Sequence, residues 1–231
     1  KTSMEKWLKS DFGLQPYKVN YILPFGVSSY QYKSYMQDLP YKDIEAELQV
    51  SLKLKLFKNI FGLNETYYLS YTQQAFWQIY IDSSPFRESI YNPEGFVIFP
   101  IQHKNAYFKF RSLKFCMAHK SNGQPNTTEM SNGKFNLSKS INYLYLTARF
   151  QHKTIIADFT AQAPFPGKEN LSDNEDIMKY MGYTKAKLTY FYKSHMFTLM
   201  LQGNLASLKG SVEGTYSYPL KYNTNFYVKI H

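Results

Sequence analysis

The chain has 231 residues, which suits one large domain or one barrel, and its net charge is +10 at pH 7. A single cysteine, Cys116, excludes an intrachain disulfide and a thiolate metal cluster, and no apolar run approaches the ~20 residues of a membrane helix. The lysines are spread along the chain at alternate positions and form no basic patch, so we expect no nucleic-acid partner. An aromatic content of 18% favours β structure at a boundary between water and an apolar phase.

Alternation of apolar and polar residues is the dominant period along the chain, as in residues 48–56, where leucines and a valine face glutamine, serine and lysines. It predicts strands near 16–25, 45–58, 65–81, 94–104, 107–120, 138–151, 153–163, 179–193, 195–204, 208–218 and 222–231. Many of these segments have about ten residues, which is the length that crosses a bilayer when a strand is tilted. Longer polar segments at 82–92, 122–136 and 164–176 are expected to be loops.

The predicted fold is all-β: one antiparallel transmembrane β-barrel domain over residues 1–231, with a short N-terminal segment at about 1–14. About eleven strands are visible, whereas single-chain bacterial barrels have an even number. Because the alternation also stops in mid-pattern at Val228-Lys-Ile-His231, we expect that a last strand is absent from this sequence.

Polar residues occupy positions on two strands that otherwise carry apolar side chains. His119 and Ser121 continue the odd-numbered face that begins with Leu113 and Phe115, and Asn142 shares a face with Leu144 and two further apolar residues. A base, a hydroxyl and a group that orients the base are the parts of a nucleophilic triad. Each residue alone is a weak signal, but polar residues at lipid-facing positions are rare and usually functional.

Gln73 is a further polar residue on an outward register, between Tyr71 and Ala75. A polar group in an apolar environment needs a hydrogen-bond partner, and a subunit interface would supply one.

Several separate motifs occur in order between about Pro16 and the C-terminus. They are Tyr71-Thr-Gln73-Gln-Ala-Phe-Trp77-Gln78, Ser83-Ser-Pro-Phe-Arg-Glu88, Tyr91-Asn-Pro-Glu94, His119-Lys-Ser121-Asn-Gly123, Ser138-Lys-Ser140-Ile-Asn142-Tyr-Leu-Tyr145 and Asp176-Ile-Met-Lys-Tyr-Met-Gly-Tyr183. Together they resemble the family of outer membrane phospholipase A. The resemblance implies a twelve-stranded β-barrel in the outer membrane of Gram-negative bacteria. It also implies calcium-dependent hydrolysis of the acyl esters of phospholipids and lysophospholipids, activated by formation of a homodimer.

The same resemblance implies roles for individual residues. Ser121 is the expected nucleophile, His119 the general base, Asn142 the group that orients the base, and the backbone amide of Gly123 the oxyanion donor. The expected ligands of Ca²⁺ are Ser83, the carbonyl of Gln124 and Ser138 in the active dimer, and Asp173 in the monomeric form. Gln124 stands where the family has arginine. Gln73 matches a glutamine at the dimer interface.

Other functions remain open at the level of sequence. A barrel without catalysis, acting as a passive pore or an adhesin, fits the same strand pattern, and lysines at positions 53, 55, 185 and 187 suit a basic lumen. A soluble β-sandwich lectin is a third hypothesis, disfavoured by strand lengths that match membrane barrels.

Overall fold

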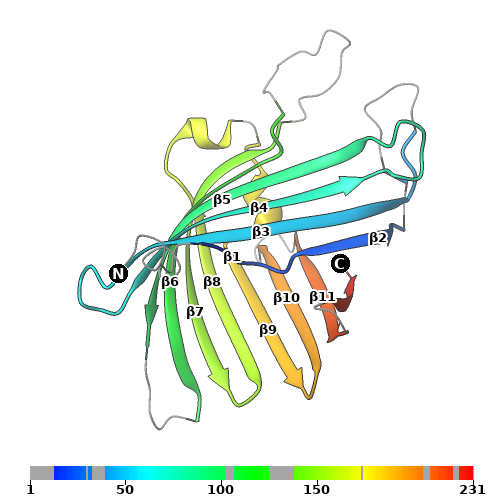
Figure 1. The fold of residues 1–231 in the computed structure, drawn as a ribbon. Helices are drawn as coiled ribbons and strands as arrows, with labels where there is room; N and C mark the ends of the chain where they lie inside the picture. The colour runs from blue at the N-terminus through cyan, green and yellow to red at the C-terminus, as the bar shows by residue number, and fades with distance from the viewer. Residues whose placement is uncertain are drawn as a thin grey trace, which may run out of the picture.

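The structure is a computed structural model that describes residues 13–29, 31–32, 40–101, 107–124, 138–172, 174–204, 209–220 and 224–230. It is one antiparallel sheet that curls strongly on itself, with long strands and a small helical segment at one end (Figure 1). The strands are β1 (Leu14–Pro16), β2 (Tyr21–Val27), β3 (Ile44–Lys58), β4 (Thr66–Trp77), β5 (Phe86–Pro100), β6 (Lys109–Ser121), β7 (Ser140–His152), β8 (Ile155–Pro164), β9 (Thr184–Tyr192), β10 (His195–Asn204), β11 (Lys209–Pro219) and β12 (Asn225–Ile230). The helical elements are η1 (Lys168–Leu171) and α2 (Ile177–Met181). None of the helices in the described ranges is long and apolar enough to cross a membrane.

Neighbouring strands in the sequence are neighbours in the sheet from β3 to β12, and the prediction of an all-β antiparallel fold is confirmed. The first predicted strand, at 16–25, is instead two short strands, β1 and β2, which both pair with β3. Between them the chain turns so that the backbone N–H of Tyr17 donates to the carbonyl of Ser51 and that of Lys18 donates to the Ser51 hydroxyl. The path from β1 to β12 therefore has eleven positions, with β2 beside β3.

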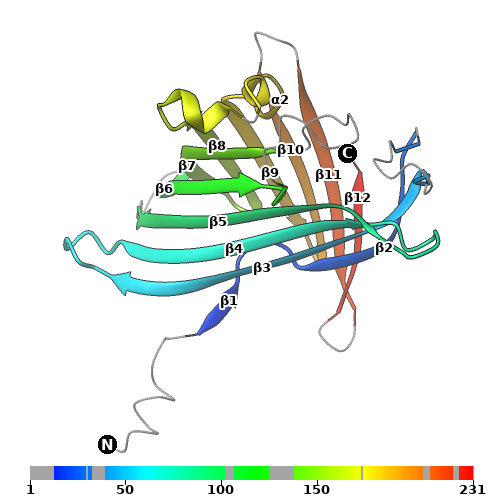
Figure 2. The same cartoon turned by 90° about the horizontal axis from the view of Figure 1, so that it is seen from above.

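The two ends of the sheet, β2 and β12, lie near one another (Figure 2), and side chains connect them. Lys229 of β12 forms an ion pair with Glu47 of β3 at 2.6 Å. The rings of Tyr227 in β12 and Tyr21 in β2 stack with their centroids 5.2 Å apart. These contacts bring the last strand next to the first, although no backbone pairing joins them within the described residues.

Two elements differ from the sequence prediction. β5 begins at Phe86, inside the segment predicted to be a loop, because its charged residue Arg87 is directed inward and binds the carboxylate of Glu45 at 2.7 Å. Residues 177–181 form α2, whereas the sequence predicted a loop up to residue 176 and a strand from residue 179. The predicted start of that strand is wrong, because the chain enters β9 only at Thr184, after a helix that buries Met178 against the core.

The core lies on the inner face of the sheet, directly behind the strands that carry the candidate site. Cys116 and Ala118 of β6 and Ile141 and Tyr143 of β7 are buried there with Met178 of α2. The alternate residues of the same strands point outward, and Phe115, Met117 and Leu146 are 42%, 53% and 43% exposed. This outer surface is apolar and faces away from the core, as expected for a membrane barrel. Burial of the inner residues fixes which side chains of β6 and β7 must face outward.

Candidate functional site

The histidine and the asparagine singled out by the sequence are direct cross-strand neighbours. His119 of β6 pairs with Asn142 of β7 in the antiparallel register. The two side chains lie on the outward face, and Nδ1 of His119 is 2.9 Å from Oδ1 of Asn142. Because the asparagine Oδ1 can only accept, Nδ1 carries the proton and donates it. The neutral ring then presents Nε2 with a free lone pair, which is the state required of a general base.

Ser121 lies two residues beyond His119 on the same face and pairs with Ser140 of β7 and Tyr91 of β5. Both His119 and Ser121 are half-buried. The structure has no hydrogen bond between the Ser121 hydroxyl and His119, and such bonds are often loose before a substrate is bound. Gln73 of β4 pairs with Tyr91, so Gln73, Tyr91 and Ser121 form one row across the sheet. The Oε1 of Gln73 accepts a hydrogen bond from the hydroxyl of Tyr71 at 3.3 Å.

The backbone immediately after Ser121 has a conformation that requires glycine. Gly123 has φ +69°, and a Cβ atom there would lie 2.9 Å from the ring of Tyr91. The adjacent Asn122 fixes this turn, because its Oδ1 accepts hydrogen bonds from the backbone N–H groups of Gln124 at 3.4 Å and Lys139 at 2.9 Å. The N–H of Gly123 has no acceptor among the described residues, which leaves it free to bind an anionic oxygen beside Ser121.

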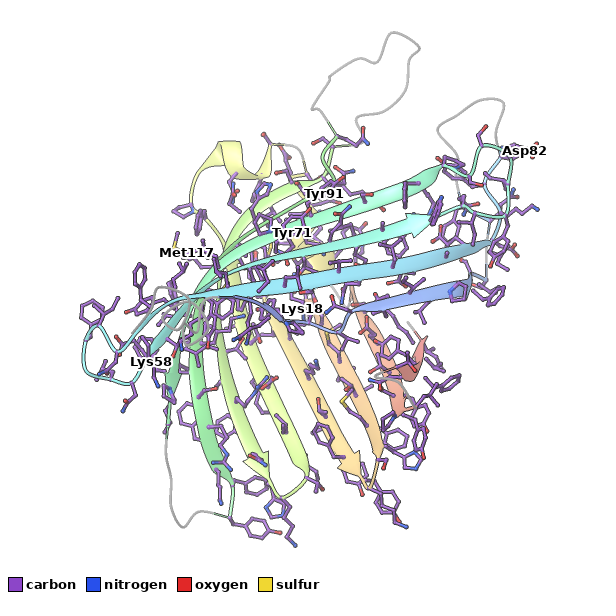
Figure 3. The ribbon with its side chains drawn as sticks, viewed as in Figure 1. Lys18, Lys58, Tyr71, Asp82, Tyr91 and Met117 are labelled. Atoms are coloured by element: carbon purple, nitrogen blue, oxygen red, sulfur yellow. The ribbon has the colours of Figure 1, made fainter. Side chains whose placement is uncertain are left out.

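The residues matched to calcium ligands lie in two places. Gln124 and Ser138 flank the connection between β6 and β7, at the same end of the strands as Ser121, and Ser138 is buried. Ser83 lies in the turn between β4 and β5, with φ +60°, and is exposed. Figure 3 shows the neighbouring Asp82 in the turn before β5, well away from Tyr91. Asp173 lies outside the described residues. No group of three His, Cys, Asp or Glu side chains in the described ranges is arranged to hold a metal ion.

Ser83, Gln124 and Ser138 offer hydroxyl and carbonyl oxygens at these positions. Such neutral oxygens, completed by water, suit Ca²⁺, which accepts many oxygen ligands in a flexible geometry. They do not suit Zn²⁺, which prefers nitrogen and sulfur. The chemistry of the residues present fits calcium.

The interior of the barrel behind the site is filled by a polar network. Glu94 of β5, which is buried, binds Lys18 at 3.4 Å and accepts a hydrogen bond from the Tyr145 hydroxyl at 3.2 Å. The Lys114 ammonium donates to the hydroxyls of Tyr145 and Tyr17. These long side chains come from the neighbouring strands β5, β6 and β7 and from the segment between β1 and β2. They meet on the inner face and fill this part of the interior.

A shallow hollow of about 890 Å³ lies over β7 to β11, away from His119 and Ser121. It follows a row of paired, mostly small outward residues: Leu146, Ala161, Thr184, Gly203 and Gly210. Its apolar lining lacks the nucleophile and base found on β6, so the hollow is separate from the candidate site.

Two residues near the site were given no role by the sequence analysis. The side chain of Asn92 in β5 donates a hydrogen bond to the carbonyl of His119 at 2.7 Å. The side chain of Asn170 in η1 accepts one from the N–H of Asn142 at 2.8 Å. Asparagines in polar segments are common, and only the fold shows which of them reach a strand.

The architecture is that of an outer-membrane β-barrel, and comparison with known proteins specifies the family. The model of the family phospholipase A1 matches residues 2–231. Phospholipase A1 of Proteus vulgaris is 31% identical over 226 residues, which are 95% of this chain and 74% of that protein. The solved structure of outer membrane phospholipase A from Escherichia coli superimposes with a TM-score of 0.81 at 27% identity, over 96% of this chain and 83% of that one.

The calcium-bound dimer of the outer membrane phospholipase from Salmonella typhi gives a TM-score of 0.82 at 27% identity, over 96% of this chain and 84% of that one. An active-site mutant of the Escherichia coli enzyme, with an asparagine replaced by alanine, also matches with a TM-score of 0.81 and 27% identity, over 96% of this chain and 83% of that one. This chain belongs to the phospholipase A1 family. It is an enzyme of the outer membrane, as the sequence motifs predicted.

Proposed function

We propose that this chain hydrolyses the acyl ester bonds of phospholipids and lysophospholipids with a Ser121–His119–Asn142 triad on the outer face of the barrel. The observation that carries the proposal is the 2.9 Å contact between His119 Nδ1 and Asn142 Oδ1 on an otherwise apolar surface, with Ser121 two residues along the same face. A site on this face meets its substrate directly in the membrane. The exposed apolar side chains of Phe115, Met117 and Leu146 are placed to contact acyl chains.

The proton path follows from the tautomer of His119. Ser121 Oγ attacks the carbonyl carbon of the ester while His119 Nε2 takes the hydroxyl proton. His119 then gives this proton to the leaving alcohol oxygen, and the acyl group stays on Ser121 as an ester. A water molecule, activated in the same way by His119, hydrolyses that ester and restores the serine. Asn142 holds the imidazole throughout by accepting from Nδ1, and as a neutral amide it places no full charge next to lipid.

The negative charge that develops on the carbonyl oxygen needs a donor near Ser121. The N–H of Gly123 is the donor that the chain itself offers. Ca²⁺ held by the Ser138 hydroxyl, the Gln124 carbonyl and the Ser83 hydroxyl would add positive charge beside this oxygen.

We propose that the calcium site is completed by a second copy of the chain. Tyr91, which pairs with Ser121, lies five positions along β5 from Phe86, at the end of the Ser83 turn. At a rise of ~3.3 Å per residue this is a separation of roughly 16 Å. A calcium ligand must lie within about 2.6 Å of the ion, so Ser83 of one chain cannot join Ser138 of the same chain. Gln73, in the same cross-strand row as Ser121, is a candidate contact of this dimer.

The test is the release of fatty acid from a long-chain phospholipid in detergent micelles, with calcium and with excess chelator. The unchanged chain is compared with Ser121→Ala and with Ser140→Ala. Ser140 is the matched control because it pairs directly with Ser121 on the same face. Heat-dependent gel mobility gives the folded fraction in each sample.

Calcium-dependent release that disappears in Ser121→Ala and persists in Ser140→Ala supports the proposed reaction and nucleophile. Equal release by folded Ser121→Ala contradicts them. Conductance in planar bilayers is the test of the passive pore, and the packed interior around Glu94 predicts none.

A further inference from the structure

The backbone ladder between β7 and β8 changes at the catalytic asparagine. Regular pairing ends at Tyr143 and Pro164, so the next pair in the register is Asn142 with Phe165. The N–H of Phe165 does donate to the carbonyl of Asn142 at 2.9 Å. The N–H of Asn142, however, donates to the side-chain Oδ1 of Asn170 at 2.8 Å. The Asn170 side chain thus replaces the backbone carbonyl of the neighbouring strand as the acceptor for the Asn142 N–H.

The Asn170 amide makes a closed pair with the backbone of Asn142. Its Nδ2 donates to the carbonyl of Asn142 at 2.8 Å while its Oδ1 accepts from the N–H of the same residue. The same Nδ2 donates to the carbonyl of Phe165 at 3.1 Å. One side chain therefore holds both backbone groups of Asn142 and ties them to the end of β8, and each bond supplies a partner to a half-buried backbone group.

The ladder between β5 and β6 is interrupted at the catalytic histidine. Glu94 pairs with Ala118 and Tyr91 pairs with Ser121, but the two positions between them are not paired. The same register places Pro93 opposite His119. Proline has no N–H and cannot donate to the carbonyl of its neighbour. The side chain of Asn92 supplies this donor, with Nδ2 at 2.7 Å from the carbonyl oxygen of His119.

The orientation of the Asn92 amide is itself fixed. Lys18 Nζ donates to Asn92 Oδ1 at 3.1 Å, which directs Nδ2 toward His119. Nδ2 also lies 3.5 Å from the hydroxyl of Tyr143. Through Lys18 and Asn92, the polar network around Glu94 is thereby connected to the backbone of His119 in β6.

We propose that Asn170 and Asn92 are positioning residues that set the backbones of Asn142 and His119 and so align the two side chains. This inference rests on the proposed function of the triad. Neither asparagine touches the reacting atoms. A displacement of one strand against the other changes the 2.9 Å contact between His119 and Asn142. Misplacement by about 1 Å costs on the order of 100-fold in rate.

The test is a double-substitution cycle read in kcat and KM per folded barrel. Asn170→Ala is expected to lower kcat by about 10- to 100-fold with KM changed less than about twofold. In a chain that already carries Asn142→Ala, the same change is expected to lower kcat by less than about twofold, because the side chain that it positions is gone. Asn170→Asp keeps an acceptor for the Asn142 N–H and is expected to be intermediate. If Asn170→Ala folds poorly, Asn170→Asp replaces it as the test variant.

Asn92→Ala is expected to lower kcat by a similar factor of about 10. Gln162→Ala is the matched control, because the Gln162 side chain also donates to backbone carbonyls, those of Met181 at 3.2 Å and Gly182 at 2.8 Å, without touching His119 or Asn142. It is expected to lower the unfolding temperature and leave kcat per folded barrel within about twofold. The rate at which a long-chain sulfonyl fluoride inactivates the enzyme gives a second reading of Ser121 reactivity.

Equal losses of kcat for Asn170→Ala in both backgrounds, or no loss in either, would overturn the positioning role. Loss of activity in Gln162→Ala as large as in Asn170→Ala would also overturn it. If Ser121→Ala hydrolyses phospholipid as fast as the unchanged chain, the proposed function fails and the positioning role with it. If Ser121→Ala is inactive while Asn170→Ala is fully active, only the positioning role fails.

Discussion

Two outward-facing histidines of this barrel have almost the same local geometry and different surroundings. His119 Nδ1 lies 2.9 Å from Asn142 Oδ1, and His195 Nδ1 of β10 lies 2.9 Å from the Tyr216 hydroxyl. His195 stands among aromatic rings, with Tyr218 at 5.0 Å and Tyr216 at 5.9 Å between ring centroids. Two residues beyond His119 is a serine, whereas two residues beyond His195 is Phe197.

Under the proposed function, a partnered histidine on the outer face is not sufficient for catalysis. His195 belongs to an aromatic cluster of the kind that barrels place at a membrane interface. His119 differs in having Ser121 on its own face and Gly123 after it in a conformation that leaves an N–H free. We propose that the combination on β6 and the turn that follows it, and not the histidine alone, supports hydrolysis.

The largest expected effect comes from removing each histidine in turn. His119→Ala removes the base that activates Ser121 and is expected to reduce kcat/KM for phospholipid by about 10⁴-fold or more. His195→Ala is expected to change it less than about threefold. The measurement is fatty-acid release in mixed micelles, divided by the folded fraction. Equal losses in the two variants would remove the distinction between the two histidines.

Removal of calcium is expected to have the next largest effect. Excess chelator removes the charge proposed to stabilise the oxyanion, so kcat should fall by about 10² to 10³-fold and recover on addition of Ca²⁺. Ser83→Ala should raise the calcium concentration needed for half-maximal activity, and Ser112→Ala, on β6 away from the site, should not. Full activity in chelator would contradict a catalytic role for the ion.

A substitution at Gly123 tests the oxyanion donor. Gly123→Ala forces a side chain onto a backbone with φ +69° and against the ring of Tyr91 at 2.9 Å, so we expect kcat to fall by about 10²-fold. Gly62→Ala is the matched control, because Gly62 has φ +77° and no atom within 4 Å of the added Cβ. If the two variants lose the same activity, backbone strain alone is the cause and the donor role of Gly123 is contradicted.

The smallest expected effect concerns stability far from the site. Burial raises the pKa of the Glu65 carboxyl, but backbone N–H donors, including those of Phe61 at 2.7 Å and Leu63 at 3.1 Å, outweigh it and hold the pKa below its usual value. A carboxyl with a lowered pKa in the folded state stabilises that state above its usual pKa, and this stabilisation is lost as the pH falls through the lowered value.

Glu65→Gln is therefore expected to lower the temperature of heat-dependent gel mobility at pH 7, with the difference shrinking below about pH 4. Exposed Glu175→Gln is the control and is expected to show no difference at either pH. A difference that is constant from pH 7 to pH 3 would contradict the linkage. Activity per folded barrel should be unchanged in Glu65→Gln, since Glu65 lies in the turn between β3 and β4, away from β6.

The sequence by itself determined the fold class and the identity of the outward residues. Side chains on a strand alternate between faces, so the apolar run through Phe115 and Met117 was enough to place His119 and Ser121 on the lipid side. The alternation pattern failed where charge is paired across strands, as for Arg87 with Glu45. It also placed the start of one strand at residue 179, where a short helix that buries Met178 precedes β9. An ion pair between residues far apart in the sequence does not change the local alternation of apolar and polar residues.

Only the tertiary structure decided which strands meet at the site and what holds them there. The register sets Asn142 opposite His119, and it puts Pro93 at the same level on the other side, where Asn92 replaces the missing donor. Asn170 reaches Asn142 from a segment 28 positions away in the chain. These contacts depend on the pairing of whole strands. The physical reason is that a hydrogen bond depends on separation in space, and sequence spacing fixes that separation only within one strand.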